Sequence, residues 1–133
     1  MKNRWLVLLL IIWSIGILFP YYFIHLFSLV YKTRFDWFFK SDVIHIIMHI
    51  FLYAVLAWLI AVVFSNKKIL ILSVIGILIA LGVSILQEFI QLITLKSPVG
   101  LDDVLDTFVD VSGAVIGIIV FRWQWSRKEQ DVK

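Results

Sequence analysis

Long apolar runs alternate with short polar segments along the whole chain. Four of the runs are long enough to cross a membrane, because a spanning helix needs about 20 apolar residues. Turn-forming residues and charges separate them, as in the segment KSPVG before the last run. The pattern predicts an all-α membrane protein, a bundle of four transmembrane helices over residues about 5–24, 43–64, 69–93 and 104–123.

The first run differs from the other three. Its basic start and apolar stretch are like those of a signal peptide, but it has no evident small-residue cleavage site and is too long. Pro20 is expected to end or kink the helix. The aromatic-rich segment after Pro20 is a candidate interfacial segment. We therefore expect one transmembrane domain over residues 1–126 and a short polar tail over residues 127–133.

Composition agrees with the pattern. Of the 133 residues, 62% are hydrophobic and 16% are charged, whereas a soluble domain has about 45–50% apolar and about 25% charged residues. The chain has no cysteine, which excludes disulfides and Cys-ligated metals. The net charge of +3 does not indicate nucleic-acid binding, because the basic residues form short clusters between apolar runs.

The distribution of basic residues predicts the orientation. Eight of the 12 Lys and Arg residues lie at the two termini and in the second loop, and the other four lie in the first and third loops. Basic residues prefer the cytoplasmic side. We expect both termini inside, as in a multi-pass protein of the bacterial cytoplasmic membrane.

Polar residues recur at helical spacing in the last three runs. Residues three, four and seven apart share one helix face, so each run carries one polar stripe. The stripes are Asp42, His45, His49 and Tyr53; Ser84, Gln87, Glu88 and Gln91; and Asp106 and Asp110, continued by Gly113 and Gly117.

The three stripes also share one depth. With a rise of about 1.5 Å per residue, His49, Glu88 and Asp110 each lie roughly 7–12 Å inside the outer end of their run. Polar groups in hydrocarbon face one another or a wet cavity. The sequence therefore predicts a polar site in the outer half of the bilayer.

The residue types suggest acid–base or metal chemistry. Carboxylates near hydrocarbon need protons, cations or strong donors, and Glu88 is the candidate general base. His45 and His49 with an Asp or Glu, Asp110 in the first place, are candidate ligands for a divalent cation, because imidazole and carboxylate suit zinc or manganese. Asp106 and Asp110 would either bind such a cation or orient a histidine. For His45 the alternative is an ordinary interhelical hydrogen bond, and Ser84 is expected to be a packing residue. The Gly113 and Gly117 pair is expected to let helices approach closely, and Asp102 or Asp103 is expected to be the N-cap of the last helix.

Three motifs in this order resemble the VanZ-like family of small bacterial membrane proteins. HIFLYAVLAWL contains a His-x-x-x-Tyr pair, QEFIQLI a Glu-x-x-Gln pair, and DTFVDVSGAVIG an Asp-x-x-x-Asp followed by Gly-x-x-x-Gly. The resemblance covers about residues 43–121. The chain departs from the family pattern in two places. Lys96 lies in the loop where the family usually has an arginine, and Gln87 stands where an acidic residue is common.

The resemblance implies an association with resistance to lipoglycopeptides such as teicoplanin, with membrane lipids or lipid-linked cell-wall precursors as partners and no nucleic acid. Two classes of function stay open. As an enzyme acting on lipid head groups, the chain would use a catalytic set and a substrate-binding set. The catalytic set is His49, Glu88, Asp106 and Asp110. The substrate-binding set is His45, Tyr53, Gln91 and Lys96. As a non-catalytic protein, it would bind such lipids or mask an antibiotic docking site. A structural bundle is the third possibility, and the oligomeric state is left open.

Overall fold

The computed structural model describes residues 2–19, 41–65, 68–95 and 100–131. Within these ranges the chain forms four helices and no strand, which confirms the predicted all-α class. The helices are α1 (Lys2–Leu18), α4 (Asp42–Val63), α5 (Ile69–Leu95) and α6 (Leu101–Asp131). The predicted interfacial segment after Pro20 and the loop residue Lys96 lie outside the described residues.

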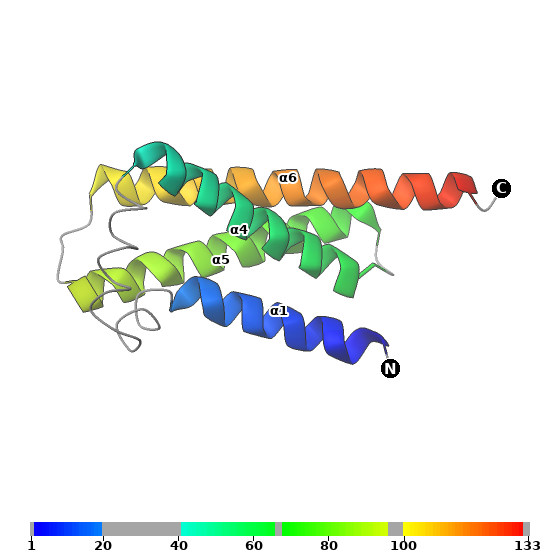
Figure 1. Ribbon diagram of the computed structural model, residues 1–133, viewed down its shortest axis with the longest axis horizontal. Helices are drawn as coiled ribbons and strands as arrows, with labels where there is room; N and C mark the ends of the chain where they lie inside the picture. Colours follow the sequence, from blue (N-terminus) through cyan, green and yellow to red (C-terminus); the bar gives the residue numbers. More distant parts are fainter. Residues whose placement is uncertain (1, 20–40, 66–67, 96–99, 132–133) are drawn as a thin grey trace.

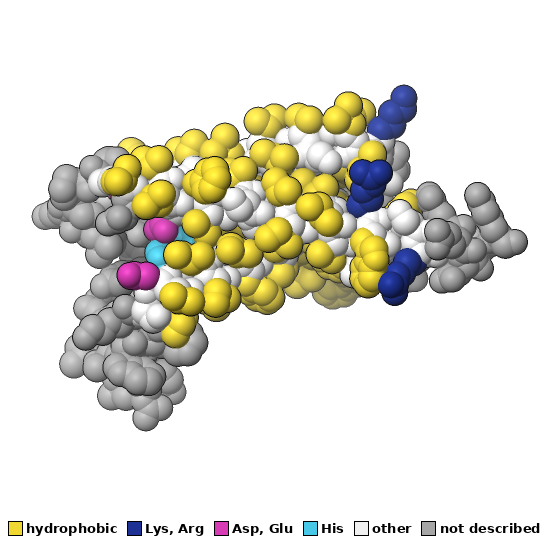
Figure 2. Space-filling model, turned by 90° about the horizontal axis from the view of Figure 1, so that it is seen from above, with side chains coloured by type: hydrophobic (Ala, Val, Ile, Leu, Met, Phe, Trp, Pro, Cys, Tyr) yellow, Lys and Arg dark blue, Asp and Glu magenta, His cyan; other side chains and the backbone are white. Residues whose placement is uncertain are grey.

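Three of the helices, α4, α5 and α6, are long and apolar enough to cross a membrane. Their apolar stretches are Asp42–Val63, Ile69–Ile93 and Asp103–Arg127, close to the predicted spans. Helix α1 is shorter and ends at Leu18, and its apolar part is Arg4–Leu18. Large apolar side chains cover much of the outside of the molecule (Figure 2). A surface of this kind fits lipid rather than water, so the structure indicates a multi-pass membrane protein.

Helices α4 and α6 run in the same direction and pack against each other along their length (Figure 1). Helix α5 runs in the opposite direction and contacts both, while α1 packs against α4 and α5. Both chain termini lie at one end of the molecule, which we call the terminal end (Figure 1). The opposite end, where α4 and α6 begin and α5 finishes, is the site end.

Glycines set the close contact between α4 and α6. A Cβ on Gly113 would lie 2.6 Å from the carbonyl oxygen of Ile50, and one on Gly117 would overlap the carbonyl oxygen of Ala54. Only a residue without a side chain allows backbones to approach this closely. The predicted packing role of this glycine pair is confirmed.

The apolar core begins beside the glycine contact and extends toward the terminal end. Small and branched side chains from all four helices fill it, and a second, smaller cluster surrounds Phe121. The buried members of the main cluster are Ile17, Tyr53, Leu56, Ala57, Ile60, Ala80, Ala114 and Ile118. Trp13 links α1 to α4 by a hydrogen bond, which its indole Nε1 donates to the carbonyl oxygen of Leu52 at 3.0 Å.

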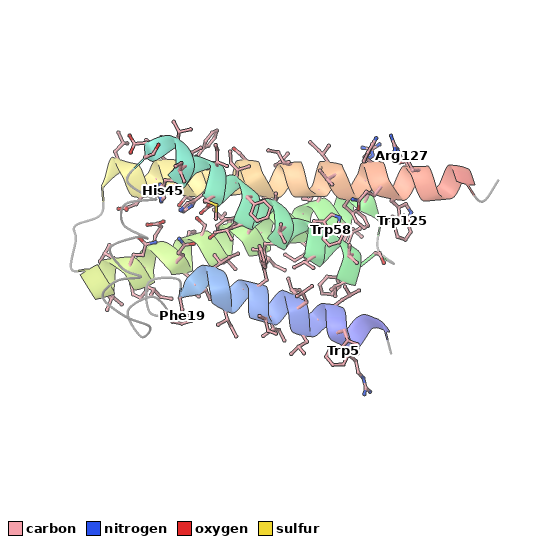
Figure 3. The ribbon with its side chains drawn as sticks, viewed as in Figure 1. Trp5, Phe19, His45, Trp58, Trp125 and Arg127 are labelled. Carbon is pink, nitrogen blue, oxygen red and sulfur yellow. The ribbon has the colours of Figure 1, made fainter. Side chains whose placement is uncertain are left out.

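Charged side chains divide between the two ends. Those Lys and Arg side chains that the structure describes lie toward the terminal end, and the described acidic and histidine side chains lie toward the site end (Figure 2). Figure 3 shows the same division, with His45 at the site end and Trp58, Trp125 and Arg127 toward the other end. The polar tail predicted from residue 127 onward begins as helix, because α6 continues to Asp131.

Candidate functional site

The polar stripe of α4 runs from the site end into the protein. Asp42 is exposed, His45 is partly exposed, His49 is 7% exposed and Tyr53 is fully buried. Each of these residues lies about one helical turn below the one before it. The stripe therefore connects the site end of the molecule with its interior.

The carboxylate of Asp110 holds the centre of the site together. It is fully buried, and each of its oxygens has a partner. Oδ1 lies 2.7 Å from Nδ1 of His49, and Oδ2 accepts a hydrogen bond of 2.6 Å from the hydroxyl of Ser84. One residue from each of α4, α5 and α6 thus meets at this point, which confirms the predicted convergence of the three stripes.

Asp110 also fixes the orientation of the His49 ring. Nδ1 of His49 faces the carboxylate of Asp110, where its N–H can donate to a carboxylate oxygen. The second ring nitrogen, Nε2, takes no part in this bond. His49 is thereby oriented and ready to take a proton or bind a cation.

Hydrogen bonds around Asp110 hold Ser84 in turn. The hydroxyl of Ser84 has one proton, and the bond to Asp110 is shorter than its 3.3 Å contact with the hydroxyl of Thr107. Thr107 donates its own proton to the carbonyl of Asp103 at 3.1 Å. Ser84 therefore positions Asp110, a role that the interpretation of Ser84 as simple packing missed.

Tyr53 closes the bottom of the site. Its hydroxyl donates a hydrogen bond of 3.0 Å to the side-chain oxygen of Gln87, and Gln87 is buried. Gln91, predicted to bind substrate, is partly exposed and has no hydrogen-bond partner among the described residues. The buried amide on α5 that the structure connects to Tyr53 is that of Gln87, one turn deeper than Gln91.

A second pair of side chains lies above the first, nearer the site end. Nδ1 of His45 is 3.7 Å from Oδ1 of Asp106, and both side chains are partly exposed. The rings of His45 and His49 are 4.4 Å apart. One ligand atom each of His45, His49 and Asp106 lie within 4.8 Å of one another. The structure thus groups Asp106 with the two histidines, where the sequence predicted Asp110.

Glu88 borders this group from α5. Its carboxylate interacts electrostatically with His49 and with Asp106. Its oxygen Oε1 is shielded from solvent and has no hydrogen-bond partner among the described residues. An unpaired oxygen of this kind costs free energy, and a bound water, cation or substrate hydroxyl would satisfy it.

The N-terminus of α6 places its acidic residues. The side chain of Asp103 accepts a hydrogen bond of 2.7 Å from the backbone N–H of Gly100, which directly precedes the helix. This bond is one half of a capping box, so Asp103 caps α6 from its first turn rather than as the predicted N-cap residue. Asp106 and Asp110 then follow on the face toward α4.

Comparisons with known proteins add no relative to this picture. No family model matches the chain, and no curated protein or solved structure matches it either. The resemblance to the VanZ-like family rests on the motifs quoted above and stays a prediction.

Proposed function

We propose that the chain is a VanZ-like protein with four membrane spans that acts on lipid head groups or lipid-linked cell-wall precursors and contributes to teicoplanin resistance. The observation that carries the proposal is the buried set of Ser84, Asp110 and His49, contributed by three helices. Polar side chains in a membrane protein interior are costly and mark functional sites. An oriented histidine beside an unpaired carboxylate oxygen is suited to acid–base chemistry.

The proposed orientation puts this site at the outer face of the bacterial cytoplasmic membrane. Support comes from the described basic side chains, which lie toward the terminal end (Figure 2), because basic residues favour the cytoplasm. The guanidinium of Arg127 lies 3.8 Å from the ring centre of Trp123, a pairing typical of a membrane interface. The apolar stretch of α1, Arg4–Leu18, reaches only about 22 Å, less than a hydrocarbon core of about 30 Å, so α1 can be the fourth span only if the bilayer thins around it.

In the proposed reaction Glu88 is the general base and His49 presents its oriented ring nitrogen to the substrate. Asp110 fixes the ring of His49, and Tyr53 with Gln87 closes the floor. The partly exposed side chains of His45 and Asp106 lie nearer the end of the helices, at the depth where a lipid head group would enter. The rest of a lipid would lie along the apolar outer surface.

The test is teicoplanin susceptibility in a sensitive Gram-positive host, with vancomycin as comparison. The host would express wild type, His49→Ala, Glu88→Gln or Asp110→Asn at equal membrane levels. Asp42→Asn is the matched control, because Asp42 lies on α4 but is exposed and outside the bonded set. We expect wild type and the control to protect, and the three site variants to lose protection at least tenfold.

The same strains separate catalysis from binding. An enzyme changes its lipid or wall precursor, so mass spectrometry of lipid extracts should show a species present with wild type and absent with Glu88→Gln. Protection that persists in Glu88→Gln, with no altered lipid, would favour a non-catalytic protein that binds precursor or masks an antibiotic docking site. Equal susceptibility of all strains would refute the proposed function.

A further inference from the structure

We infer that His45, His49 and Asp106 bind a divalent transition-metal ion, zinc above all, and that Asp110 is an outer partner of the site rather than a ligand. The inference names the cofactor of the proposed site and rests on the proposed function for its biological role. The metal binding itself needs no substrate and can be tested without one.

The types of ligand favour zinc. Two imidazoles and one carboxylate form the ligand set of many catalytic zinc sites, in which a water occupies the fourth position. Magnesium and calcium prefer sites made of oxygen atoms. The chain has no cysteine that could compete for the ion. His45 and His49 are four residues apart on one helix, the spacing with which a helix presents two imidazoles to one metal.

The distances fit with small adjustments. Ligand atoms about 2.0–2.1 Å from a tetrahedral zinc lie roughly 3.3 Å from one another. The separation between His45 and Asp106 is 3.7 Å, and all three ligand atoms lie within 4.8 Å of one another. The side chain of His45 is 39% exposed and that of Asp106 is 22% exposed. Rotation of these two partly exposed side chains can move their ligand atoms by the roughly one ångström needed to surround the ion. The ring of His49 is already held in place by Asp110.

Asp110 supplies an independent observation. A histidine that binds a metal almost always donates its other ring N–H to a carboxylate or carbonyl, which fixes the ring and strengthens the ligand. His49 and Asp110 have this arrangement at 2.7 Å, with Ser84 holding the far oxygen of Asp110. Because Asp110 is fully buried and both of its oxygens are bonded, it is placed to orient His49 and not to bind the metal.

Glu88 supplies a second independent observation in favour of a bound metal ion. Its oxygen Oε1 is shielded and unpaired among the described residues, and its charge acts on His49 and Asp106. A metal-bound water is a strong hydrogen-bond donor, and it would satisfy this oxygen. The same contact would make Glu88 the base for that water.

The test uses the full chain purified in detergent, stripped with a chelator and titrated with ZnCl2 by calorimetry. Cobalt(II) is the optical probe, since a tetrahedral site with nitrogen and oxygen ligands gives it visible absorption. We expect one zinc per chain. His45→Ala and Asp106→Asn should weaken binding at least tenfold, and Asp110→Asn should weaken it 10- to 100-fold, as outer-partner changes do. Asp42→Asn should bind as wild type does.

Folding of each variant is checked by its helicity and by its elution as a single species in size-exclusion chromatography. His45 and Asp106 are partly exposed, so their variants should fold even if Asp110→Asn does not. Zinc binding that is absent in wild type, or equal in wild type, His45→Ala and Asp106→Asn, would overturn the inference. Stoichiometric zinc in a protein that gives no teicoplanin protection would leave the metal site standing and refute only the proposed function.

Discussion

Helices α4 and α6 meet in two different ways along one contact. Toward the site end, polar side chains face each other in register: His45 lies opposite Asp106, and His49 opposite Asp110. Toward the terminal end, apolar side chains such as Leu56, Ile60 and Ile118 fill the interface. The glycine contact at residues 113 and 117 lies between the two halves.

The two halves differ in what they contribute. Interhelical hydrogen bonds in membrane proteins are worth only about 0.6 kcal/mol on average, so the polar half adds little stability for the groups it buries. Close packing at the glycines and in the apolar half holds the helices and sets their register. The polar groups then lie where packing places them, which leaves them available for chemistry.

The largest expected effect comes from the glycine contact. Replacing Gly117 by valine would drive a side chain into the backbone of Ala54, and overpacking typically costs about 1–3 kcal/mol, with backbone clashes at the upper limit. We expect the free energy of unfolding, measured by SDS-induced loss of helicity, to fall by about 3 kcal/mol. The polar side chains of α4 and α6 should also move out of register, so the proposed teicoplanin protection and zinc binding would both be lost.

Gly82→Ala is the matched control. A Cβ at Gly82, on α5, would have no atom within 4 Å, and Ala is the better helix former by about 1 kcal/mol in water. We expect stability equal to wild type or slightly higher. If Gly117→Val were as stable as Gly82→Ala, packing at the crossing would not fix the register of α4 and α6.

Much of this arrangement follows from the sequence. Apolar runs define the helices, because the length of a span is fixed by the bilayer, and spacing by three and four residues defines the polar faces. The predicted meeting of His49, Asp110 and the α5 stripe rests on these two rules alone. Gly-x-x-x-Gly on the Asp110 face likewise predicted close approach.

Axial register is what the sequence did not reveal. Hydrophobicity allows a helix to slide by a turn without moving its polar face, so nothing in the pattern chose between Asp106 and Asp110 as the acid grouped with the two histidines. The same turn of uncertainty separates Gln87, the buried partner of Tyr53, from Gln91, the α5 amide that the sequence placed in the site. Packing of specific side chains decides it, and sequence spacing does not encode that packing.

Ser84 was missed for a different reason. Serines in helices commonly donate to the carbonyl one turn back, as Ser14, Ser73 and Ser112 do here. Ser84 instead donates across to Asp110. Its place on the stripe of Glu88 was the available signal, but only a partner of known depth makes that signal decisive.

The next effect in size tests whether the polar half serves stability. Asp110→Ala would leave His49 and Ser84 without their buried partner, at a cost of about 1–3 kcal/mol. Replacing all three together, with His49→Leu, Ser84→Ala and Asp110→Leu, removes every group that needs a partner, so stability should return to within about 1 kcal/mol of wild type. The same SDS titration measures both. A triple variant less stable than Asp110→Ala would show that the network is mainly structural.

A smaller effect is expected for the buried pair Tyr53 and Gln87 at the inner end of the site. A double-mutant cycle with Tyr53→Phe and Gln87→Leu isolates their hydrogen bond. Because both side chains are buried, the coupling energy should be about 0.6–1.7 kcal/mol, the range of average to strong bonds between membrane helices. Coupling near zero would mean that the bond competes with water reaching the floor.

The smallest effect is expected at the terminal end, where α4 and α6 make a hydrogen bond almost as long as the one between Tyr53 and Gln87. Nε1 of Trp58 donates to the side-chain oxygen of Gln124 at 2.9 Å, but this contact is exposed. Water or head groups can replace either partner, so a cycle with Trp58→Phe and Gln124→Leu should give a coupling energy below about 0.5 kcal/mol. If this coupling equalled that of Tyr53 and Gln87, burial would not distinguish the two halves. A clear difference would show that two bonds of similar geometry on the same helix differ in strength because only one of them is shielded.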